Sequence, residues 1–453
     1  MSADDVADDA VDVVVVGMGP GGEVVASRLL AAGKRVAVVE RELIGGECGY
    51  WACIPTKTLL RPPEARSEAD RAPGVGRPEL DWAGLVAFRD EMTRHLDDSK
   101  QVAGYEDQGA LVLKGSARLA GPGVVEVGDR RLTADHVVLA TGSDPTRPPI
   151  DGLDEAEVWT NREATQLRDV PGRAVVVGGG PVGLELGQFL SRVGAQVTLV
   201  QSADRLINRE DPRVGELIAA ALADDGVDVR VGRRVAAVAR QAGGTRVTLD
   251  DGSTVDTDVV VIGAGRRPRT SGLGLETVGV EPGERGLAVD DRCRVAPGLW
   301  AVGDVTGVAL FTHVAKYQAR IVADNILGRD RRAQYRGIPR VVFSDPEIAA
   351  VGLTAAQARE QGHDVATATV SIPDALARPW TYERDPRGEL GLVADRARGV
   401  LLGAWAVAPL ASEWIHQAAL AVRAEVPLDV LLDGVAQFPT YAEAYLAGLE
   451  QLA

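Results

Sequence analysis

The sequence predicts an α/β fold with two Rossmann-like dinucleotide-binding domains and a C-terminal α+β domain. Two segments repeat the order of strand, glycine-rich turn, helix and strand that such domains require, and the last quarter of the chain lacks it. With 453 residues, 45% of them apolar, the chain is long enough for about three domains of ~150 residues each. We predict domain segments at residues 1–150, 151–268, 269–336 and 337–453, the third segment completing the domain that the first begins.

The first dinucleotide-binding motif begins with an apolar run at residues 13–16. The turn GMGPGG follows and opens a helical pattern that continues to Ala31, and a second apolar run occupies residues 36–39. Glycines in such a turn let the backbone approach a pyrophosphate at the helix N-terminus, and an acid after the second strand binds ribose hydroxyls. The segment therefore predicts a dinucleotide site that contains Gly17, Gly19, Gly22 and Glu40.

A second copy of the motif begins at residues 174–177 and continues through GGGPVG, a helical pattern and a strand at residues 196–200. This strand ends in Gln201 rather than Asp or Glu, so the carboxylate that usually selects NAD is absent. Arg205 and Arg209 are the nearest cations that could meet a 2′-phosphate. The sequence leaves the choice between NADH and NADPH open. The glycines of this second site are Gly178, Gly180 and Gly183.

Two shorter signals close further strands. Thr141 and Gly142 lie in HVVLATGSDP, and Gly303 and Asp304 lie in LWAVGDVTG. We expect both turns to return the backbone against a bound dinucleotide, with the Asp304 carboxylate able to accept hydrogen bonds from sugar or ribityl hydroxyls. Residues 61–78, rich in Pro, Arg and Ala, are predicted to be an exposed irregular stretch.

The stretch GGECGYWACIPTK sets Cys48 and Cys53 five residues apart, and Cys293 is the only other cysteine. A close pair in an intracellular protein is more often catalytic or metal-binding than a structural disulfide. A five-residue step in an ideal helix turns the side chain by ~140°, so this pair needs a distorted turn, with Cys48 before the regular helix that Pro55 introduces. Because a helix N-terminus stabilises a thiolate, Cys53 is the better candidate for the charged sulfur.

Composition argues against several classes of partner. A formal net charge of −16 without a basic stripe argues against nucleic-acid binding. The acidic N-terminus lacks the features of a signal peptide, and no apolar run approaches the ~20 residues that span a bilayer. We therefore expect a cytoplasmic protein with no membrane partner, and we predict no metal site.

Together these motifs resemble the class I pyridine nucleotide–disulfide oxidoreductases, a family that includes dihydrolipoamide dehydrogenase, glutathione reductase, mercuric reductase and soluble transhydrogenase. The resemblance runs from about residue 11 to residue 444 and is most specific in the cysteine stretch. It implies a homodimeric enzyme that binds FAD in the first domain and NADH or NADPH in the second, with a C-terminal dimerisation domain. The FAD-binding residues that it implies are Gly17, Gly19, Gly22, Glu40, Gly46, Lys57, Ala117, Thr141, Gly142, Asp304, Phe311, Thr312 and His313. Those for NAD(P) are Gly178, Gly180, Gly183, Glu185, Gln201 and Gly265.

The same resemblance implies the catalytic roles. Cys53 would be the thiolate against the flavin, and Cys48 would react with the external substrate. Lys57, one of only five lysines, would pair with Glu185 beside flavin N5. A helix that begins near Thr312 would direct its N-terminal dipole at the flavin pyrimidine edge.

The C-terminal motif departs from the family. Disulfide reductases of this class carry H-P-T-x-x-E, whose histidine moves protons for the substrate thiol, whereas this chain reads FPTYAE, with Phe438 in place of the histidine and Glu443 retained as a catalytic candidate. General acid–base assistance is worth ~10²–10⁴ in rate, so an ordinary dithiol substrate is not expected. His416 is a weaker candidate for a substitute base.

Three functions remain after this departure. The first is an NAD(P)H oxidoreductase that passes electrons through FAD and a redox-active Cys48–Cys53 disulfide to a small-molecule acceptor, such as an electrophile or a thiol-bound metal. The second uses the flavin directly, as a quinone reductase, a metal-ion reductase or a soluble transhydrogenase. The segment PTYAEAY of this chain resembles the ending of soluble transhydrogenases. Mercury is not expected as the dedicated substrate, since the tail LEQLA lacks the cysteine pair of mercuric reductase. The third is a redox-silent flavin-binding protein.

Overall fold

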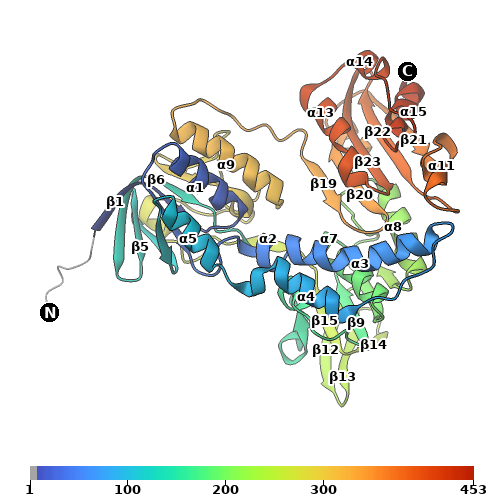
Figure 1. Ribbon diagram of the computed structural model, residues 1–453, viewed down its shortest axis with the longest axis horizontal. Coiled ribbons are helices and arrows are strands. Elements are labelled where there is room, and N and C mark those ends of the chain that lie inside the picture. The colour runs from blue at the N-terminus through green and yellow to red at the C-terminus, as the bar shows by residue number, and fades with distance from the viewer. Residues whose placement is uncertain (1–7) are drawn as a thin grey trace. The chain divides into compact units, whose positions relative to one another are not determined.

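The computed structural model describes residues 8–453 and divides the chain into two compact units (Figure 1). Unit 1 comprises Met1–Pro55, Ala87–Thr146 and Arg266–Gln334, and unit 2 comprises Thr56–Val86, Arg147–Gly265 and Tyr335–Ala453. The fold class predicted from the sequence is confirmed, because both glycine motifs lie in parallel sheets and the C-terminal segment forms an antiparallel one. Among the described residues, no helix combines the length and the apolar character needed to cross a membrane.

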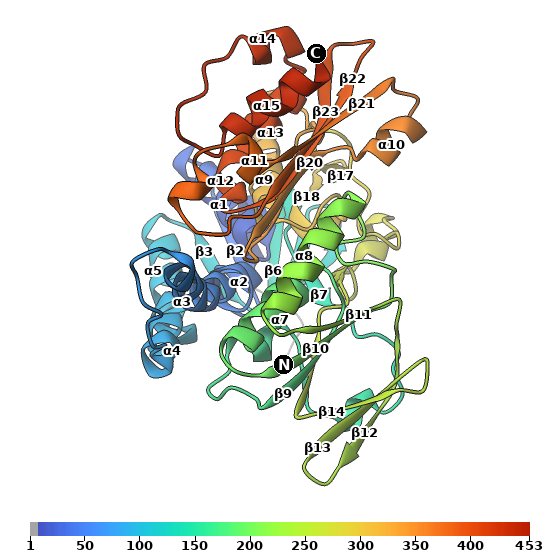
Figure 2. The same ribbon diagram turned by 90° about the vertical axis from the view of Figure 1, so that its right-hand side faces the viewer.

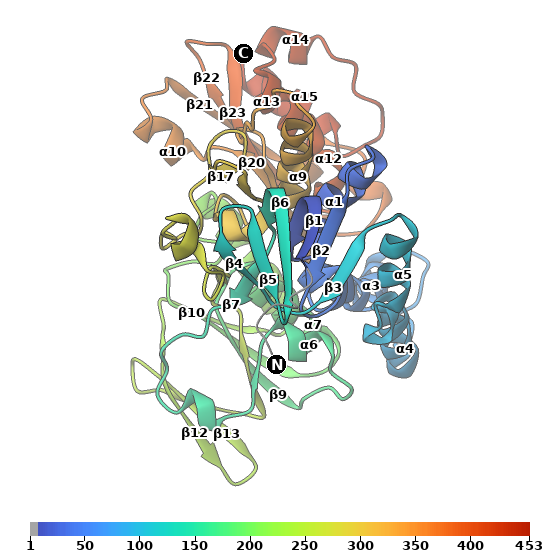
Figure 3. The ribbon, with the colours of Figure 1, turned by 90° about the vertical axis from the view of Figure 1, so that its left-hand side faces the viewer.

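Unit 1 is built on a mostly parallel sheet with the strand order β17-β18-β6-β1-β2-β3, which Figure 3 shows together with α1. Alternate residues of β1 supply two cores, since successive side chains of a strand point to opposite faces. Val13 and Val15 are buried with α1 and α9, and Val14 and Val16 are buried with β4 and β5. The elements are β1 (Asp8–Val16), α1 (Pro20–Ala31), β2 (Val36–Glu40), α2 (Gly46–Tyr50), η1 (Arg94–Leu96), α5 (Ser99–Asp107), β3 (Leu111–Lys114), β4 (Ala117–Gly121), β5 (Val124–Val127), β6 (Arg130–Leu139), β7 (Ser143–Pro145), β16 (Arg266–Pro268), η3 (Leu275–Val278), β17 (Arg294–Ala296), β18 (Leu299–Ala301), η4 (Gly303–Thr306) and α9 (Thr312–Ile326).

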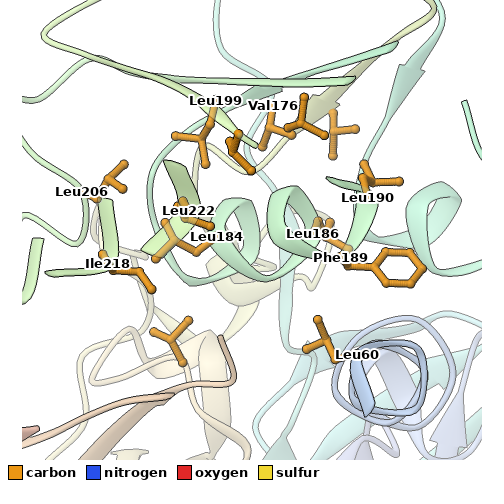
Figure 4. Packing of buried hydrophobic residues seen from close by; sticks show 14 of the residues in the cluster. Leu60, Val176, Leu184, Leu186, Phe189, Leu190, Leu199, Leu206, Ile218 and Leu222 are labelled. Carbon is orange, nitrogen blue, oxygen red and sulfur yellow. The ribbon is translucent and has the colours of Figure 1, made fainter. Parts of the chain in front are cut away.

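The first part of unit 2 is a parallel sheet with the order β11-β10-β9-β15-β8 and a small antiparallel sheet, β12-β13-β14. Helix α7 lies against the parallel sheet, and its residues Leu184, Leu186, Phe189 and Leu190 belong to one apolar cluster with Val176 of β9 and Leu60 (Figure 4). The elements are η2 (Leu153–Glu155), β8 (Val158–Trp159), α6 (Asn161–Thr165), β9 (Arg173–Val177), α7 (Pro181–Arg192), β10 (Gln196–Gln201), α8 (Pro212–Asp224), β11 (Asp228–Val231), β12 (Val235–Gln241), β13 (Gly244–Leu249), β14 (Thr254–Thr257) and β15 (Val259–Ile262).

The C-terminal part of unit 2 is an antiparallel sheet with the order β19-β20-β23-β22-β21, and α13 and α15 lie on one side of it in Figure 2. Helix α13 contributes Ala418 and Val422 to the core beneath, and α15 contributes Tyr445 and Leu449. The elements are β19 (Pro339–Val342), β20 (Glu347–Gly352), α10 (Ala355–Glu360), β21 (Val365–Ser371), α11 (Ile372–Ala375), η5 (Pro379–Thr381), β22 (Glu389–Asp395), β23 (Val400–Ala408), α12 (Ala411–Trp414), α13 (His416–Ala424), α14 (Leu428–Leu432) and α15 (Glu443–Leu452).

The sequence prediction for residues 61–78 was wrong over most of its length. Helix α3 extends over Cys53–Arg71 and contains both Pro62 and Pro63, and helix α4 follows at Trp82–Met92. A proline removes its own N–H donor from a helix but leaves its carbonyl free to accept, and Pro63 is buried. The strong helix formers around the prolines, in EARSEADR, outweigh that loss.

Candidate functional site

In the glycine turn of unit 1, packing requires two of the glycines, and the backbone at Gly19 is open to solvent or a ligand. Gly17 has φ +93°, and a Cβ there would lie 2.5 Å from the carbonyl oxygen of Ala140. A Cβ on Gly22 would lie 2.0 Å from the carbonyl oxygen of Gly17, so neither position admits a side chain. A Cβ on Gly19 would meet no atom within 4 Å. Packing therefore does not require a glycine at position 19. The bare backbone of Gly19 fits the close approach of a pyrophosphate to the N-terminus of α1.

The glycine turn of unit 2 repeats this division. Gly178 has φ +113° and a Cβ there would lie 2.5 Å from the carbonyl oxygen of Gly263, while a Cβ on Gly183 would lie 1.8 Å from the carbonyl oxygen of Gly178. Gly180, which precedes α7, again has open space around it. Both turns therefore fit a dinucleotide phosphate, as their sequences predict.

The residue that ends the second strand of each motif contacts the turn. The Glu40 carboxylate accepts the backbone N–H of Met18 at 2.7 Å and that of Glu42 at 2.7 Å. The side-chain oxygen of Gln201 accepts the N–H of Gly179 at 3.2 Å. Met18 and Gly179 are the residues that follow the first glycine of their turns, so Gln201 occupies the place of Glu40 without its charge.

The cysteine stretch contains the distorted turn that the spacing requires. Cys48 lies in the short helix α2, and Cys53 is the first residue of α3. Between the helices Trp51 has φ −134°, and the N–H groups of Trp51 and Ala52 both donate to the carbonyl of Glu47, at 2.9 and 2.7 Å. The helical path is thus broken between the two cysteines.

Thr312, the first residue of α9, lies against both sulfurs. Its hydroxyl donates to Sγ of Cys48 at 3.2 Å and lies 3.4 Å from Sγ of Cys53. Both cysteines are partly buried, whereas Cys293 is fully buried. A hydrogen bond to Cys53 and then burial raise the pKa of the Cys48 thiol, and the Thr312 contact lowers it in part. The Cys48 thiol therefore holds its proton more tightly than an ordinary cysteine does.

Asp304 lies in η4 and is buried beside polar groups. The hydroxyl of Ser143 donates to its carboxylate at 2.5 Å and itself accepts from Nε of Arg266 at 2.7 Å. Burial raises the pKa of Asp304, although the bond from Ser143 and the charge of Arg266 oppose the shift. A carboxylate held by donors in this way fits hydrogen bonding to sugar or ribityl hydroxyls. Sequence reasoning missed Ser143 and Arg266, and the basic run RRPR after Gly265 is the only signal that pointed to the arginine.

The other residues of unit 1 that were predicted to bind FAD lie in the glycine turn's surroundings, in strand ends or at the start of α9. Gly46 has φ +60°, and a Cβ there would lie 2.8 Å from Cα of Gly19, so the cysteine stretch and the glycine turn are in contact. The Thr141 hydroxyl donates to the carbonyl of Arg269 at 2.8 Å, and Gly142 follows it with φ +74°. Phe311 precedes α9 and its ring stacks on that of His313, with centroids 5.1 Å apart. Ala117 begins β4.

Lys57 and Glu185 form an ion pair in unit 2. Nζ of Lys57 lies 2.7 Å from the Glu185 carboxylate, whose other oxygen accepts the N–H of Phe343 at 2.9 Å. Nζ also lies 4.7 Å from the centroid of the Phe343 ring, within cation–π distance. The Glu185 side chain is 7% exposed, so its charge is shielded from solvent. Sequence reasoning predicted the ion pair and missed Phe343, which no motif marked.

The C-terminal motif presents an apolar side chain. Phe438 is 74% exposed, and Glu443, at the start of α15, accepts the N–H of Thr440 at 2.9 Å. His416 is exposed at the start of α13. Gly265 follows β15 with φ +108°. The described residues contain no group of three or more His, Cys, Asp or Glu side chains arranged to hold a metal ion.

Comparison with known proteins agrees with this geometry. A family model described as pyridine nucleotide-disulphide oxidoreductase matches residues 11–319, and one described as the dimerisation domain of that family matches residues 338–447. A mercuric reductase of Streptomyces lividans is 37% identical over 96% of this chain and 94% of its own, and a dihydrolipoyl dehydrogenase of Thermus scotoductus is 35% identical over 97% of each chain. A solved structure of the HOCl-induced flavoprotein disulfide reductase RclA from Escherichia coli superposes with a TM-score of 0.87 at 28% identity, covering 98% of this chain and 100% of that one.

Proposed function

Because this chain belongs to the pyridine nucleotide-disulphide oxidoreductase family, whose members bind FAD and use NAD(P)H, we propose that it reduces a small-molecule acceptor through Cys48 and Cys53. The observation that carries the proposal is the contact of both sulfurs with one hydroxyl, that of Thr312. The disulfide form of the pair accepts two electrons and becomes the dithiol, and the dithiol returns them to the acceptor.

Unit 1 would hold FAD by the open backbone at Gly19, the carboxylate of Glu40 and the buried carboxylate of Asp304. FAD, when bound, supplies the means of passing the two electrons of a nicotinamide hydride to the cysteine pair. In unit 2, Gly178, Gly180 and Gly183 would receive the nicotinamide nucleotide.

The Lys57–Glu185 pair would hold the Lys57 ammonium in place for electron transfer. The Glu185 carboxylate is held on one side by Lys57 and on the other by the N–H of Phe343, so it cannot rotate without losing one of them. A fixed ammonium stabilises negative charge that develops during hydride transfer without the cost of reorganising solvent.

The two sulfurs divide the chemistry between them. Cys48 keeps the proton of the reduced pair, because its bond to Cys53 and its burial raise its pKa. It would give up that proton as its sulfur bonds to the acceptor, and the Cys53 sulfur would then attack Cys48, so that the disulfide forms and the bond between Cys48 and the reduced acceptor breaks.

The acceptor is proposed to be a compound that needs no external proton donor at the C-terminal motif. Phe438 carries no titratable group, and the Glu443 carboxylate is engaged with the N–H of Thr440. A small electrophile or a thiol-bound metal ion meets this condition, and mercuric reductases are among the relatives. The exposed Phe438 also favours a second candidate, direct reduction of a quinone or a second nicotinamide by the flavin.

Turnover in wild type and Cys48→Ser separates the two candidates. The acceptors tested are lipoamide, glutathione disulfide, a quinone, Hg(II) and a nicotinamide analogue. We expect Cys48→Ser to lower turnover with the preferred acceptor by a factor of about 10² or more. Its FAD content and its rate of flavin reduction should stay within about twofold of the wild-type values. Cys293→Ser is the matched control, since that thiol is fully buried and should leave turnover unchanged. Retained turnover in Cys48→Ser would reject the cysteine route and favour the flavin-only candidate.

We also propose that the chain acts as a homodimer through residues 337–453, on the support of the dimerisation-domain match. The domain boundaries proposed for the whole chain are those predicted from the sequence, residues 1–150, 151–268, 269–336 and 337–453. Sedimentation of the FAD-loaded protein at a mass near 47.6 kDa rather than twice that value would reject the homodimer.

A further inference from the structure

The two dinucleotide turns of this chain provide an internal comparison of nucleotide choice. In the first, the Glu40 carboxylate accepts the N–H of Met18 at 2.7 Å. In the second, the amide oxygen of Gln201 accepts the N–H of Gly179 at 3.2 Å. Gln201 thus keeps the hydrogen bond that fixes the turn and lacks the negative charge that Glu40 brings to the adenosine ribose.

The rest of the Gln201 side chain also differs from a carboxylate. The second oxygen of Glu40 accepts the N–H of Glu42, whereas the amide nitrogen of Gln201 is a donor that lies 3.5 Å from the carbonyl of Arg205. At 3.5 Å this is a weak hydrogen bond, so the amide N–H remains able to turn to an anionic oxygen. A carboxylate at the same place would repel a 2′-phosphate, and a neutral amide donor does not.

Arg205 supplies a cation on the same turn. Its guanidinium contacts one carboxylate, that of Asp204 at 3.4 Å, and Asp204 is 83% exposed. A second contact goes to the carbonyl of Asn208 at 2.9 Å. Nε of Arg205 is buried without a hydrogen-bond partner among the described residues, so a ligand would meet the exposed part of this side chain, which is 34% exposed overall. By contrast, the guanidinium of Arg213 on α8 is held by both oxygens of Glu389, at 3.0 and 2.6 Å. Arg205 is therefore weakly committed to the protein and free to pair with a phosphate.

A second cation near the strand end, Arg233, is already paired. The backbone N–H of Arg233 donates to the carbonyl of Gln201 at 3.0 Å, and the Arg233 side chain is paired with Asp251 at 2.8 Å. We infer that the nicotinamide site takes the nucleotide that carries a 2′-phosphate, NADPH, with Gln201 and Arg205 as the residues that determine this specificity. The inference rests on the proposed function only in assigning the second glycine turn to the nicotinamide nucleotide.

Calorimetric titration of the FAD-loaded protein with two half-nucleotides tests the inference. The probes are 2′,5′-ADP, which carries the 2′-phosphate, and 5′-AMP, which lacks it. We expect wild type to bind 2′,5′-ADP at least about tenfold more tightly than 5′-AMP, with an affinity that falls as salt is raised. The same order should hold for NADP⁺ against NAD⁺.

Variants assign the preference to residues. Gln201→Glu keeps an acceptor for the N–H of Gly179 and should weaken 2′,5′-ADP at least about tenfold while 5′-AMP changes little. Arg205→Leu should weaken 2′,5′-ADP to a similar degree and spare 5′-AMP. Arg246→Leu is the matched control, because it removes an arginine of the same unit that is paired with Asp256 on β14.

Equal or tighter binding of 5′-AMP by wild type would overturn the inference, as would an unchanged preference in Gln201→Glu. Retained 5′-AMP binding shows that a variant is folded at this turn. Binding of the half-nucleotides requires neither cysteine, so Cys48→Ser should keep the preference even if the proposed route through Cys48 fails.

Discussion

Thr312 donates a hydrogen bond from its hydroxyl to Sγ of Cys48 over 3.2 Å. The same hydroxyl lies 3.4 Å from Sγ of Cys53, so one residue at the start of α9 contacts two sulfurs that lie in different helices. The contact lowers the pKa of Cys48 against the larger effects of Cys53 and burial. Thr312 therefore acts as a positioning residue for the pair, and its hydrogen bond opposes part of the rise in the pKa of Cys48.

Replacing Thr312 with valine tests this role, because valine keeps the shape of the side chain and removes the hydroxyl. The pKa of Cys48 should rise, so the alkylation rate of the reduced protein at fixed pH should fall by about tenfold, the value of a hydrogen bond to a charged group. Iodoacetamide labelling across pH, read by mass spectrometry at Cys48, measures the change. Thr367→Val, at an exposed position of strand β21, is the control, and an equal effect there would contradict the role of Thr312.

The glycines of the first turn should separate folding from cofactor binding. Gly22→Ala places a Cβ 2.0 Å from a backbone oxygen and should lower the free energy of unfolding by about 1–3 kcal/mol or more. Gly19→Ala meets no atom within 4 Å and should cost about 1 kcal/mol or less, yet its methyl group should weaken FAD binding by about tenfold. Urea unfolding and FAD fluorescence titration measure the two quantities. Gly180→Ala is the matched variant in the other turn and should leave FAD binding unchanged.

Phe343 should position Lys57 through its ring. Phe343→Leu keeps the backbone N–H that binds Glu185 and removes the cation–π contact, which is worth about 0.5–2 kcal/mol. We expect flavin reduction by NAD(P)H to slow by about 2–30-fold, and Phe343→Tyr to restore it. Stopped-flow absorbance at the flavin band measures the rate, and an unchanged rate in Phe343→Leu would show that the ring has no part in positioning the ammonium.

Asp345 should be a main determinant of stability in unit 2. Its carboxylate binds both nitrogens of Arg71, at 2.9 and 3.1 Å, and that of Arg192 at 2.8 Å, and the Arg192 side chain is 9% exposed. Asp345→Asn removes the carboxylate that these cations share, while Arg71 keeps Glu383 and Arg192 keeps Asp225, so we expect a loss of about 1–3 kcal/mol. Urea unfolding at pH 7 measures the loss, and Asp256→Asn, in an exposed pair, should change stability little.

The difference in unfolding free energy between wild type and Asp345→Asn should depend on pH in a defined direction. Burial alone would raise the pKa of Asp345, but Arg192 and Arg71 outweigh it and hold the pKa below the ordinary value of 3.8. The unfolded chain therefore binds this proton first, and the stabilisation is present at neutral pH and is lost as pH falls below 3.8 through the folded pKa. The gap between wild type and Asp345→Asn should shrink in that acid window and stay constant above it.

The sequence predicted the elements whose signals are local. The two glycine turns and the strands that flank them follow from backbone restrictions at Gly17 and Gly178, which no other residue satisfies. The break between Cys48 and Cys53 followed from helix geometry alone. Both are constraints that act within a few residues.

Apart from the Lys57–Glu185 pair, which the family resemblance implied, contacts between distant segments were not predicted. Thr312 lies 264 residues from Cys48, and Phe343 lies 158 residues from Glu185, so no spacing rule links either pair. The helix through Pro62 and Pro63 was missed because a proline signal is local, whereas the burial of Pro63 that offsets it depends on the fold. The roles of these long-range contacts became apparent only from their distances and burial.

Phe438→His should restore the proton route that the C-terminal motif lacks. The position is 74% exposed, so an imidazole fits there without repacking of the core. Glu443 follows in the same motif, and its carboxylate accepts the N–H of Thr440. If the absent histidine is what limits dithiol chemistry, turnover with lipoamide should rise by about 10–10², with a dependence on pH near 6.5, the ordinary pKa of histidine. Gln437→His, which places the same group at the neighbouring exposed position, is the control. An equal gain in both variants would point to a general effect of the imidazole rather than to the motif. No gain in Phe438→His alongside normal flavin reduction would mean that the acceptor is excluded by shape rather than by the missing proton donor.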